Sequence, residues 1–182
     1  GLGVAPLKPD PDRYEHKFEY CDILVVGSGP SGLAGALAAA KNGAKVILAE
    51  DKPRFGGSLL TDEVTIGNKN GKDWVDETIA QLKSMPNVIV KNRSQVFGYY
   101  DHNMMVMCER TKDHIENPSK FIPRQRLWYI RAKEVIISTG SIERPLVFGN
   151  NDRPGIMLAS AAKEYMKVYG VLVGKKPIVF TN

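Results

Sequence analysis

The stretch Ile23-Leu24-Val25-Val26-Gly27-Ser28-Gly29-Pro30-Ser31-Gly32 decides the fold of this chain. Four apolar residues typical of a buried strand run into a glycine-rich turn, and the alanine-rich stretch Leu33 to Lys41 continues as a helix. In a dinucleotide-binding unit the first glycine permits a tight turn, the second admits the pyrophosphate and the third lets the helix pack against the sheet. The predicted cofactor contacts in this loop are Gly27, Ser28, Gly29, Pro30, Ser31 and Gly32.

Two acidic residues follow the next strand. Asn42-Gly43 ends the helix, and Lys45 to Ala49 forms a second apolar run that leads into Glu50 and Asp51. Glu50 lies about twenty residues beyond the glycines, where a carboxylate accepts hydrogen bonds from an adenosine ribose. A carboxylate there repels a 2′-phosphate, so the pattern favours NAD or FAD over NADP. A glycine-rich turn without a ligand would not require this combination of strand, helix and acidic residue.

Length and charge exclude several classes of protein. The 182 residues suffice for one nucleotide-binding domain but not for a substrate domain as well, so we expect both ends to be cut from a larger protein. The net charge of +5 is spread without a basic arm, which argues against nucleic-acid binding. No apolar run is long enough to span a membrane, and we expect a cytoplasmic protein or one on the inner side of a membrane.

The chain is expected to divide into four parts. Residues 1–20 carry Pro6, Pro9 and Pro11 and are predicted to form an extended linker. The dinucleotide-binding domain is predicted over 21–145 and a connecting segment with a helix over 146–176. Residues 177–182 read as a strand that starts the next, truncated domain.

The order of elements within 21–145 indicates the fold class. After a long loop over 52–72, the apolar spacing from Trp74 to Leu82 predicts a helix, and residues 87–90 predict a third buried strand. Three strand-like runs follow at 95–100, 104–109 and 126–132, and the apolar run 135–138 returns to the sheet. This order predicts an α/β fold, a GR-like FAD/NAD(P)-binding Rossmann domain with a parallel sheet and an inserted three-stranded antiparallel meander.

Further cofactor contacts are expected outside the first loop. A second glycine pair, Gly56-Gly57, follows the acidic strand end and precedes Ser58; a surface turn is the alternative. Thr139-Gly140 ends the last strand at the sheet edge where such folds bind ligands, with a simple strand-ending turn as the alternative. The predicted set also includes Val96 in the meander.

No catalytic or metal site is expected. The three histidines, His16, His102 and His114, lack spaced partners and read as loop residues. Cys21 and Cys108 form neither a disulfide framework nor a metal site and read as small apolar fillers. No cysteine pair follows Gly57, so dithiol chemistry is excluded at that position.

The chain resembles the alpha subunits of heterotetrameric sarcosine oxidases. Four segments carry this resemblance: 97–103 (FGYYDHN), 123–128 (PRQRLW), 139–148 (TGSIERPLVF) and 151–161 (NDRPGIMLASA). They are more specific than the glycine fingerprint, and the resemblance extends over nearly the whole chain.

The resemblance implies an oxidoreductase that acts on the CH–NH group of sarcosine, with oxygen as acceptor and glycine and hydrogen peroxide as products. In this family the alpha subunit holds NAD, whereas FAD, FMN and tetrahydrofolate bind elsewhere in a complex with beta, gamma and delta subunits. By that resemblance Gly27, Gly29, Gly32, Glu50, Gly57 and Gly140 would contact NAD, and the segment alone would be inactive.

The chain differs from the family at two serines, and two alternative functions remain. The family commonly has alanines in place of Ser28 and Ser31, whose hydroxyls we expect near the phosphates. The run 178–182 does not begin a second glycine fingerprint, which argues against a reductase with two dinucleotide sites. The chain could instead be the FAD-binding domain of a flavin-dependent reductase or dehydrogenase, or a scaffold for assembly that has lost its ligand.

Overall fold

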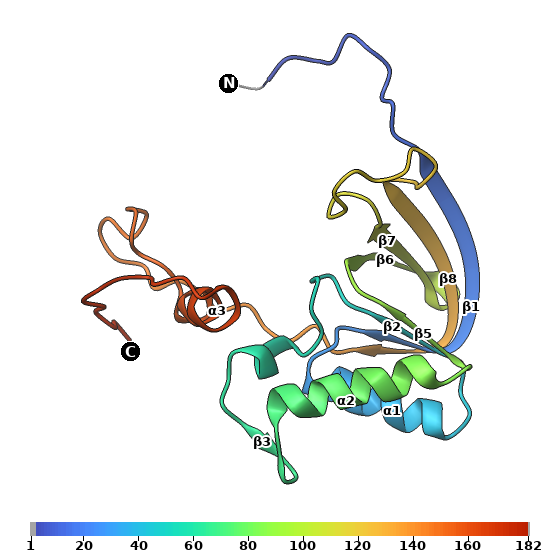
Figure 1. Ribbon diagram of the computed structural model, residues 1–182, viewed down its shortest axis with the longest axis horizontal. Coiled ribbons are helices and arrows are strands. Elements are labelled where there is room, and N and C mark those ends of the chain that lie inside the picture. The colour runs from blue at the N-terminus through green and yellow to red at the C-terminus, as the bar shows by residue number, and fades with distance from the viewer. Residues whose placement is uncertain (1–2, 182) are drawn as a thin grey trace.

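The computed structural model describes residues 3–181 and is built around one mixed sheet (Figure 1). In the described chain the sheet has six strands in the order β5-β2-β1-β8-β7-β6. Their bounds are β1 Tyr14–Val26, β2 Val46–Ala49, β5 Val88–Lys91, β6 Ser94–Tyr100, β7 Met104–Arg110 and β8 Gln125–Ile137. A small hairpin, β3 Thr65–Ile66 with β4 Lys69–Asn70, lies apart from this sheet.

The helices are α1 Pro30–Lys41, α2 Gly71–Ser84 and α3 Ala159–Tyr169, with 3-10 turns η1 Gly57–Leu60 and η2 Asp101–Asn103. Strands β5, β2, β1 and β8 pair in parallel, whereas β7 and β6 continue from β8 in antiparallel pairing. The α/β class, with a parallel sheet and an inserted three-stranded meander, is therefore confirmed.

The molecule has three layers around the parallel strands. Figure 1 shows α1 and α2 on one side of β2 and β5, with β6 and β7 on the other. Between the helices and the sheet lies one apolar cluster, which includes Val25, Leu33 and Leu48. Between the sheet and the meander lies a second cluster, which includes Leu24 and Met107. Neighbouring residues of β1, Leu24 and Val25, thus pack into different clusters, because neighbouring side chains of a strand point to opposite faces of the sheet.

Helix α1 begins in the glycine-rich turn and ends at Lys41, as the sequence predicts. Pro30 occupies its first turn, where the missing N–H costs no hydrogen bond, and Leu33, Ala36 and Ala40 are buried on one face. In helix α2 the Asn70 side chain accepts a hydrogen bond from the Lys72 N–H at 2.9 Å. The cap thus sets where α2 begins, as Pro30 does for α1.

Strand β1 begins earlier than the sequence suggested. Residues 14–20, expected in the extended linker 1–20, belong to β1 and pair with residues 125–131 of β8. The physical reason is that β8 offers a free edge whose backbone groups gain partners from this segment. The alternation of aromatic and charged residues from Tyr14 to Tyr20 is the period-2 signal that the prolines masked.

Strand β8 is also longer than expected. The runs 126–132 and 135–138 were predicted as two strands, but β8 is a single strand from Gln125 to Ile137. It pairs with β7 on one side and with β1 on the other, and so joins the meander to the parallel sheet. The predicted division into domains remains a prediction.

The end of the described chain differs from the expected strand. Residues 177–181 form no strand in the described part of the chain, because a strand needs a neighbour to accept its backbone hydrogen bonds. The Phe180 ring instead lies edge-on to Phe148, with ring centroids 5.5 Å apart. A helix, α3, does lie within the segment predicted to contain one. Residues 1–2 and 182, which ended the predicted terminal segments, lie outside the described residues.

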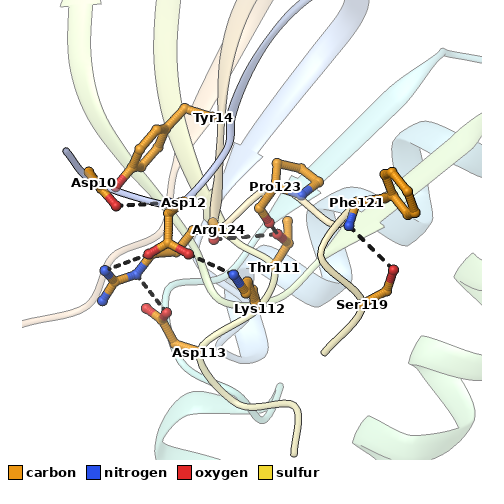
Figure 2. A network of polar contacts seen from close by, with 10 residues as sticks. All are labelled: Asp10, Asp12, Tyr14, Thr111, Lys112, Asp113, Ser119, Phe121, Pro123 and Arg124. Carbon is orange, nitrogen blue, oxygen red and sulfur yellow. Dashed lines mark hydrogen bonds and ion pairs between the residues drawn. The ribbon is translucent and has the colours of Figure 1, made fainter. Parts of the chain in front are cut away.

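A charged network fastens the start of β1 to the loop between β7 and β8 (Figure 2). Asp12 accepts hydrogen bonds from Lys112 Nζ at 2.6 Å and from Arg124 Nη1 at 3.1 Å. Arg124 also binds Asp113, and its N–H donates to the Arg13 carbonyl at 2.7 Å. The side chain of Asp12 is only 17% exposed, so this carboxylate links residues distant in sequence.

Candidate functional site

The glycine-rich loop lies at the carboxyl edge of the parallel strands. Gly27 has φ +98°, and a Cβ there would lie 2.4 Å from the Ser138 carbonyl oxygen. A Cβ on Gly32 would lie 2.0 Å from the Gly27 carbonyl oxygen. Both positions therefore require glycine, as the fingerprint predicts, the first for the turn and the second for close packing of α1.

Gly29 differs from its two neighbours. It is the N-cap of α1, with φ −66°, and a Cβ built on it would meet nothing within 4 Å. No side-chain hydrogen bond caps this helix start, and Pro30 has no N–H. Leu33 N–H donates to the Gly29 carbonyl, which leaves the N–H groups of Ser31 and Gly32 in the first turn. An open surface beside helix N–H groups suits the phosphates of a dinucleotide.

The second glycine pair packs on the first loop. The Gly56 N–H donates to the Ser28 carbonyl at 3.0 Å, and a Cβ on Gly57 would lie 3.0 Å from the Gly29 Cα. Gly56 and Gly57 have φ values of +120° and +54°, which favour glycine. The pair therefore packs directly beside Gly29. Ser58 follows in η1 and is exposed.

Glu50 lies directly against the loop. Its Oε2 accepts hydrogen bonds from the Ser28 N–H at 2.9 Å and from the Ser28 hydroxyl, and its Oε1 accepts from the Lys52 N–H at 2.9 Å. The Ser28 side chain is buried and points to Glu50. This corrects the expectation that its hydroxyl lies near the phosphates, whereas Ser31 is exposed at the helix start.

The residues that follow β8 lie at the same carboxyl edge of the sheet as the glycine-rich loop. The Ser138 N–H donates to the Val26 carbonyl at 2.8 Å, and the Thr139 Cα would lie 3.3 Å from a Cβ on Gly27. Gly140 follows with φ +72°. Thr139 and Gly140 are exposed at this edge, so the structure brings them to the glycine-rich loop.

Two predicted contacts lie at the border of this edge. Asp51 is exposed, and its carboxylate accepts from Arg110 Nη2 at 2.7 Å. Val96 is half-buried in β6 and packs against the core between sheet and meander. It lies two residues after Ser94, whose N–H donates to the Glu50 carbonyl at 2.8 Å. The meander thus reaches the strand end that carries Glu50.

A half-buried charge network links the meander to the parallel strands. Glu109 accepts hydrogen bonds from Lys91 Nζ at 2.9 Å, Trp128 Nε1 at 2.7 Å and Arg126 Nη1 at 3.0 Å. Burial by itself raises the pKa of Glu109, but these three donors outweigh it, and the pKa lies below its usual range. Glu109 therefore stays ionised and joins β5, β7 and β8.

The described residues also have features that lie away from the glycine-rich loop. They contain no cluster of histidine, cysteine and acidic residues able to hold a metal. Burial raises the pKa of Cys21 to about 12, which leaves a poor nucleophile. A cavity of about 770 Å³ lies on the outer face of the meander, away from the glycine-rich loop, between residues such as Phe97, Tyr129 and Arg131. No helix among the described residues is long and apolar enough to cross a membrane.

Sequence reasoning missed two residues of this edge. Ser138 was assigned to a strand end, yet its carbonyl is what excludes a side chain at Gly27. Arg110 carried no signal in the sequence, because its contact with Asp51 depends on where the meander folds over the sheet.

Comparison with known proteins agrees with the expected resemblance. The chain is 48% identical, over its whole length, to sarcosine oxidase subunit alpha of Rhizobium meliloti (strain 1021), of which it covers 18%. It is 42% identical, also over its whole length, to the corresponding subunit of Corynebacterium sp. (strain P-1), of which it covers 19%. The chain thus spans about a fifth of the length of these relatives, and the resemblance to sarcosine oxidase alpha subunits is confirmed.

A solved structure shows the same architecture. L-proline dehydrogenase from P. horikoshii superposes with a TM-score of 0.71 at 25% identity, over 88% of this chain and 31% of that chain. The sequence model of the family described as FAD dependent oxidoreductase matches residues 22–117, more than half of the chain and including the glycine-rich loop, Glu50 and the second glycine pair. With its fold and its glycine-lined sheet edge in agreement, the chain belongs to the FAD dependent oxidoreductase family.

Proposed function

We propose that this chain is the dinucleotide-binding segment of a sarcosine oxidase-type alpha subunit and that it binds one NAD. The diphosphate lies at Gly29 and the first turn of α1, the adenosine ribose at Glu50, and Thr139-Gly140 borders the same ligand. The other predicted contacts, Asp51, Gly56, Ser58 and Val96, surround it.

One observation carries the proposal: the open space at Gly29. Gly27 and Gly32 are closed by backbone within 2.4 Å of an added Cβ, whereas Gly29 faces nothing within 4 Å. Packing thus explains glycine at the two closed positions, and at Gly29 a ligand explains it. The flanking helix N–H groups and the positive end of the helix dipole favour an anion there.

The decisive experiment combines cofactor identification with a Gly29→Ala variant. Mass spectrometry of the small molecule released from the purified chain is expected to show NAD. Gly29→Ala should fold as the native chain does, because φ −66° suits alanine and the space is open, yet lose nucleotide retention. A variant that keeps its full complement of nucleotide would overturn the placement.

FAD is the second candidate, and the family match favours it. The family is described as FAD dependent, and the match covers the loop and Glu50. The two ligands share the adenosine diphosphate half, so both fit the same residues. A yellow protein with flavin absorbance would decide for FAD, and a colourless protein that releases NAD would decide against it. Absence of both ligands, together with binding to another subunit, would favour a scaffold for assembly.

The proposed activity rests on the resemblance to sarcosine oxidase alpha subunits. We infer that the chain contributes to oxidation of the CH–NH group of sarcosine, with oxygen as acceptor and hydrogen peroxide formed. Beta, gamma and delta subunits are its proposed partners, and FAD, FMN and tetrahydrofolate are proposed to bind outside these residues. Copurification of the complete subunits with tagged alpha subunit, followed by a peroxide assay with sarcosine, tests this assignment.

A further inference from the structure

Helix α3 is attached by ion pairs and a hydrogen bond to the segment 52–63, which lies beside the glycine-rich loop. Lys163 Nζ lies 2.6 Å from Asp62 Oδ1, and Lys52 Nζ lies 3.0 Å from Glu164 Oε1. Lys167 pairs with Glu63, and Arg54 donates to the Val168 carbonyl at 3.4 Å. All four contacts join α3 to the segment 52–63, which contains the second glycine pair, and Figure 1 shows α3 beside that segment and apart from the sheet.

Apolar packing contributes little to this attachment. No residue of α3 is buried, and Tyr165, Met166 and Tyr169 are each more than 40% exposed. The start of the helix is held by another charge, since Glu143 accepts hydrogen bonds from the Ala159 and Ser160 N–H groups. The position of α3 therefore depends on electrostatic contacts, which water and salt weaken.

Lys52 connects α3 to Glu50, the carboxylate proposed to bind the ribose. Its N–H donates to Glu50 Oε1 at 2.9 Å while its ammonium group binds Glu164 on α3. Four residues later, Gly56 donates to the Ser28 carbonyl, and Gly57 packs on Gly29. The segment that α3 holds is thus the one that contacts both Glu50 and the glycine-rich loop.

We propose that α3 is a positioning element for the dinucleotide site, with Lys52 as the positioning residue that transmits its docking to Glu50. The proposal rests on the proposed dinucleotide site. Docked α3 keeps the 52–63 segment in the geometry that binds nucleotide. Separation of α3 weakens two backbone hydrogen bonds together, from Lys52 to Glu50 and from Gly56 to the Ser28 carbonyl. Weak charged contacts suit this role, because a moderate change in them shifts the docked fraction.

The test exchanges two adjacent charges on α3. The double variant Lys163→Glu/Glu164→Lys keeps the net charge but places like charges opposite Asp62 and Lys52. It is expected to weaken NAD binding, measured by calorimetry on the whole chain, about threefold to tenfold. Amide exchange at Lys52 and Gly56, measured by NMR, should accelerate in parallel. The further change Asp62→Lys should recover part of both readouts, because it recreates one of the two pairs and leaves Lys52 in place.

A matched control and separate readouts make the outcomes distinct. Asp152→Arg/Arg153→Asp exchanges two adjacent exposed charges outside these contacts and should bind NAD as the native chain does. Unchanged affinity and unchanged exchange in the α3 double variant would overturn the inference while the proposed function stands. If the native chain binds neither NAD nor FAD, the proposed function fails, and the exchange rates at Lys52 and Gly56 still decide whether α3 holds the segment.

Discussion

The hydroxyl of Ser28 is buried and donates to the carboxylate of Glu50, which also accepts from the Ser28 N–H at 2.9 Å. This pair joins the glycine-rich loop to the end of the neighbouring strand. A carboxylate has about four positions for accepted hydrogen bonds. Ser28 and Lys52 supply three donors, which leaves about one position for a ribose hydroxyl.

Glu50→Ala is expected to weaken NAD binding by about 1.5–3 kcal/mol, because the charge-assisted hydrogen bond to the ribose is lost and the loop loses its anchor. Calorimetric titration with NAD measures the effect. Unchanged affinity would mean that the ribose binds elsewhere.

Ser28→Ala separates the structural role of Glu50, which anchors the glycine-rich loop, from its proposed role in binding the ribose. The chain should lose about 1 kcal/mol of unfolding free energy, because one hydrogen bond disappears from a buried position. NAD affinity should not fall, because Glu50 gains a free acceptor position for the ribose. Urea unfolding and titration with NAD together check this pair of outcomes, and a loss of affinity as large as that of Glu50→Ala would contradict it.

Gly32→Ala and Gly35→Ala, both in α1, should act in opposite directions. A Cβ on Gly32 would lie 2.0 Å from the Gly27 carbonyl oxygen, so alanine should cost about 1–3 kcal/mol of unfolding free energy or more. A Cβ on Gly35 would only reach ordinary contact, 3.5 Å from Ile136 Cδ1, so alanine should stabilise the helix by up to about 1 kcal/mol. Denaturant midpoints compare the two, and equal shifts would argue against the close packing at Gly32.

Glu109→Gln is expected to make stability less dependent on acid pH. The folded-state pKa of Glu109 lies below its usual value, so its stabilising contribution is present above the unfolded pKa of about 4.3 and is lost as the pH falls through the folded pKa. The variant should therefore be about 1.5–3 kcal/mol less stable than the native chain at pH 7, with a smaller difference below about pH 4. Urea unfolding across this range measures it.

Glu116→Gln is the matched control for that series, because Glu116 is exposed in the loop between β7 and β8. It should follow the native chain at every pH. A difference for Glu109→Gln that stays constant with pH would argue against an ionised carboxylate in the network.

Cys21 should resist alkylation in the folded chain. It is fully buried, and burial raises its pKa to about 12, so neither access nor thiolate is available near pH 8. Iodoacetamide labelling followed by peptide mass spectrometry should show slow modification of Cys21 and faster modification of the half-buried Cys108. Both should react readily in denaturant. Rapid labelling of Cys21 in the folded chain would contradict its burial.

Much of the central fold could be predicted, because local signals and long-range packing agree there. The apolar run before Gly27, the start of α1 at Pro30 and the end of α2 before Pro86 each follow from residues within a few positions. The glycine-rich loop, the pair Gly56-Gly57 and Glu50 were also recognisable, since the turns that carry them are specified by local residues. The first half of β1, residues 14–20, was not predicted, because prolines near residue 10 obscured an alternation whose partner strand lies about 110 residues away.

The sequence by itself determined the strand, glycine turn and helix, with an acidic residue after the next strand, because hydrophobic period and glycine conformation act over short distances. Only the tertiary structure decided that Gly57 packs on Gly29, that Ser138 closes the space at Gly27, that Ser28 turns its hydroxyl to Glu50 and that α3 binds the 52–63 segment. These contacts join residues that are distant in sequence, and no local preference specifies them. They arise when the sheet, the meander and the helices pack at one edge.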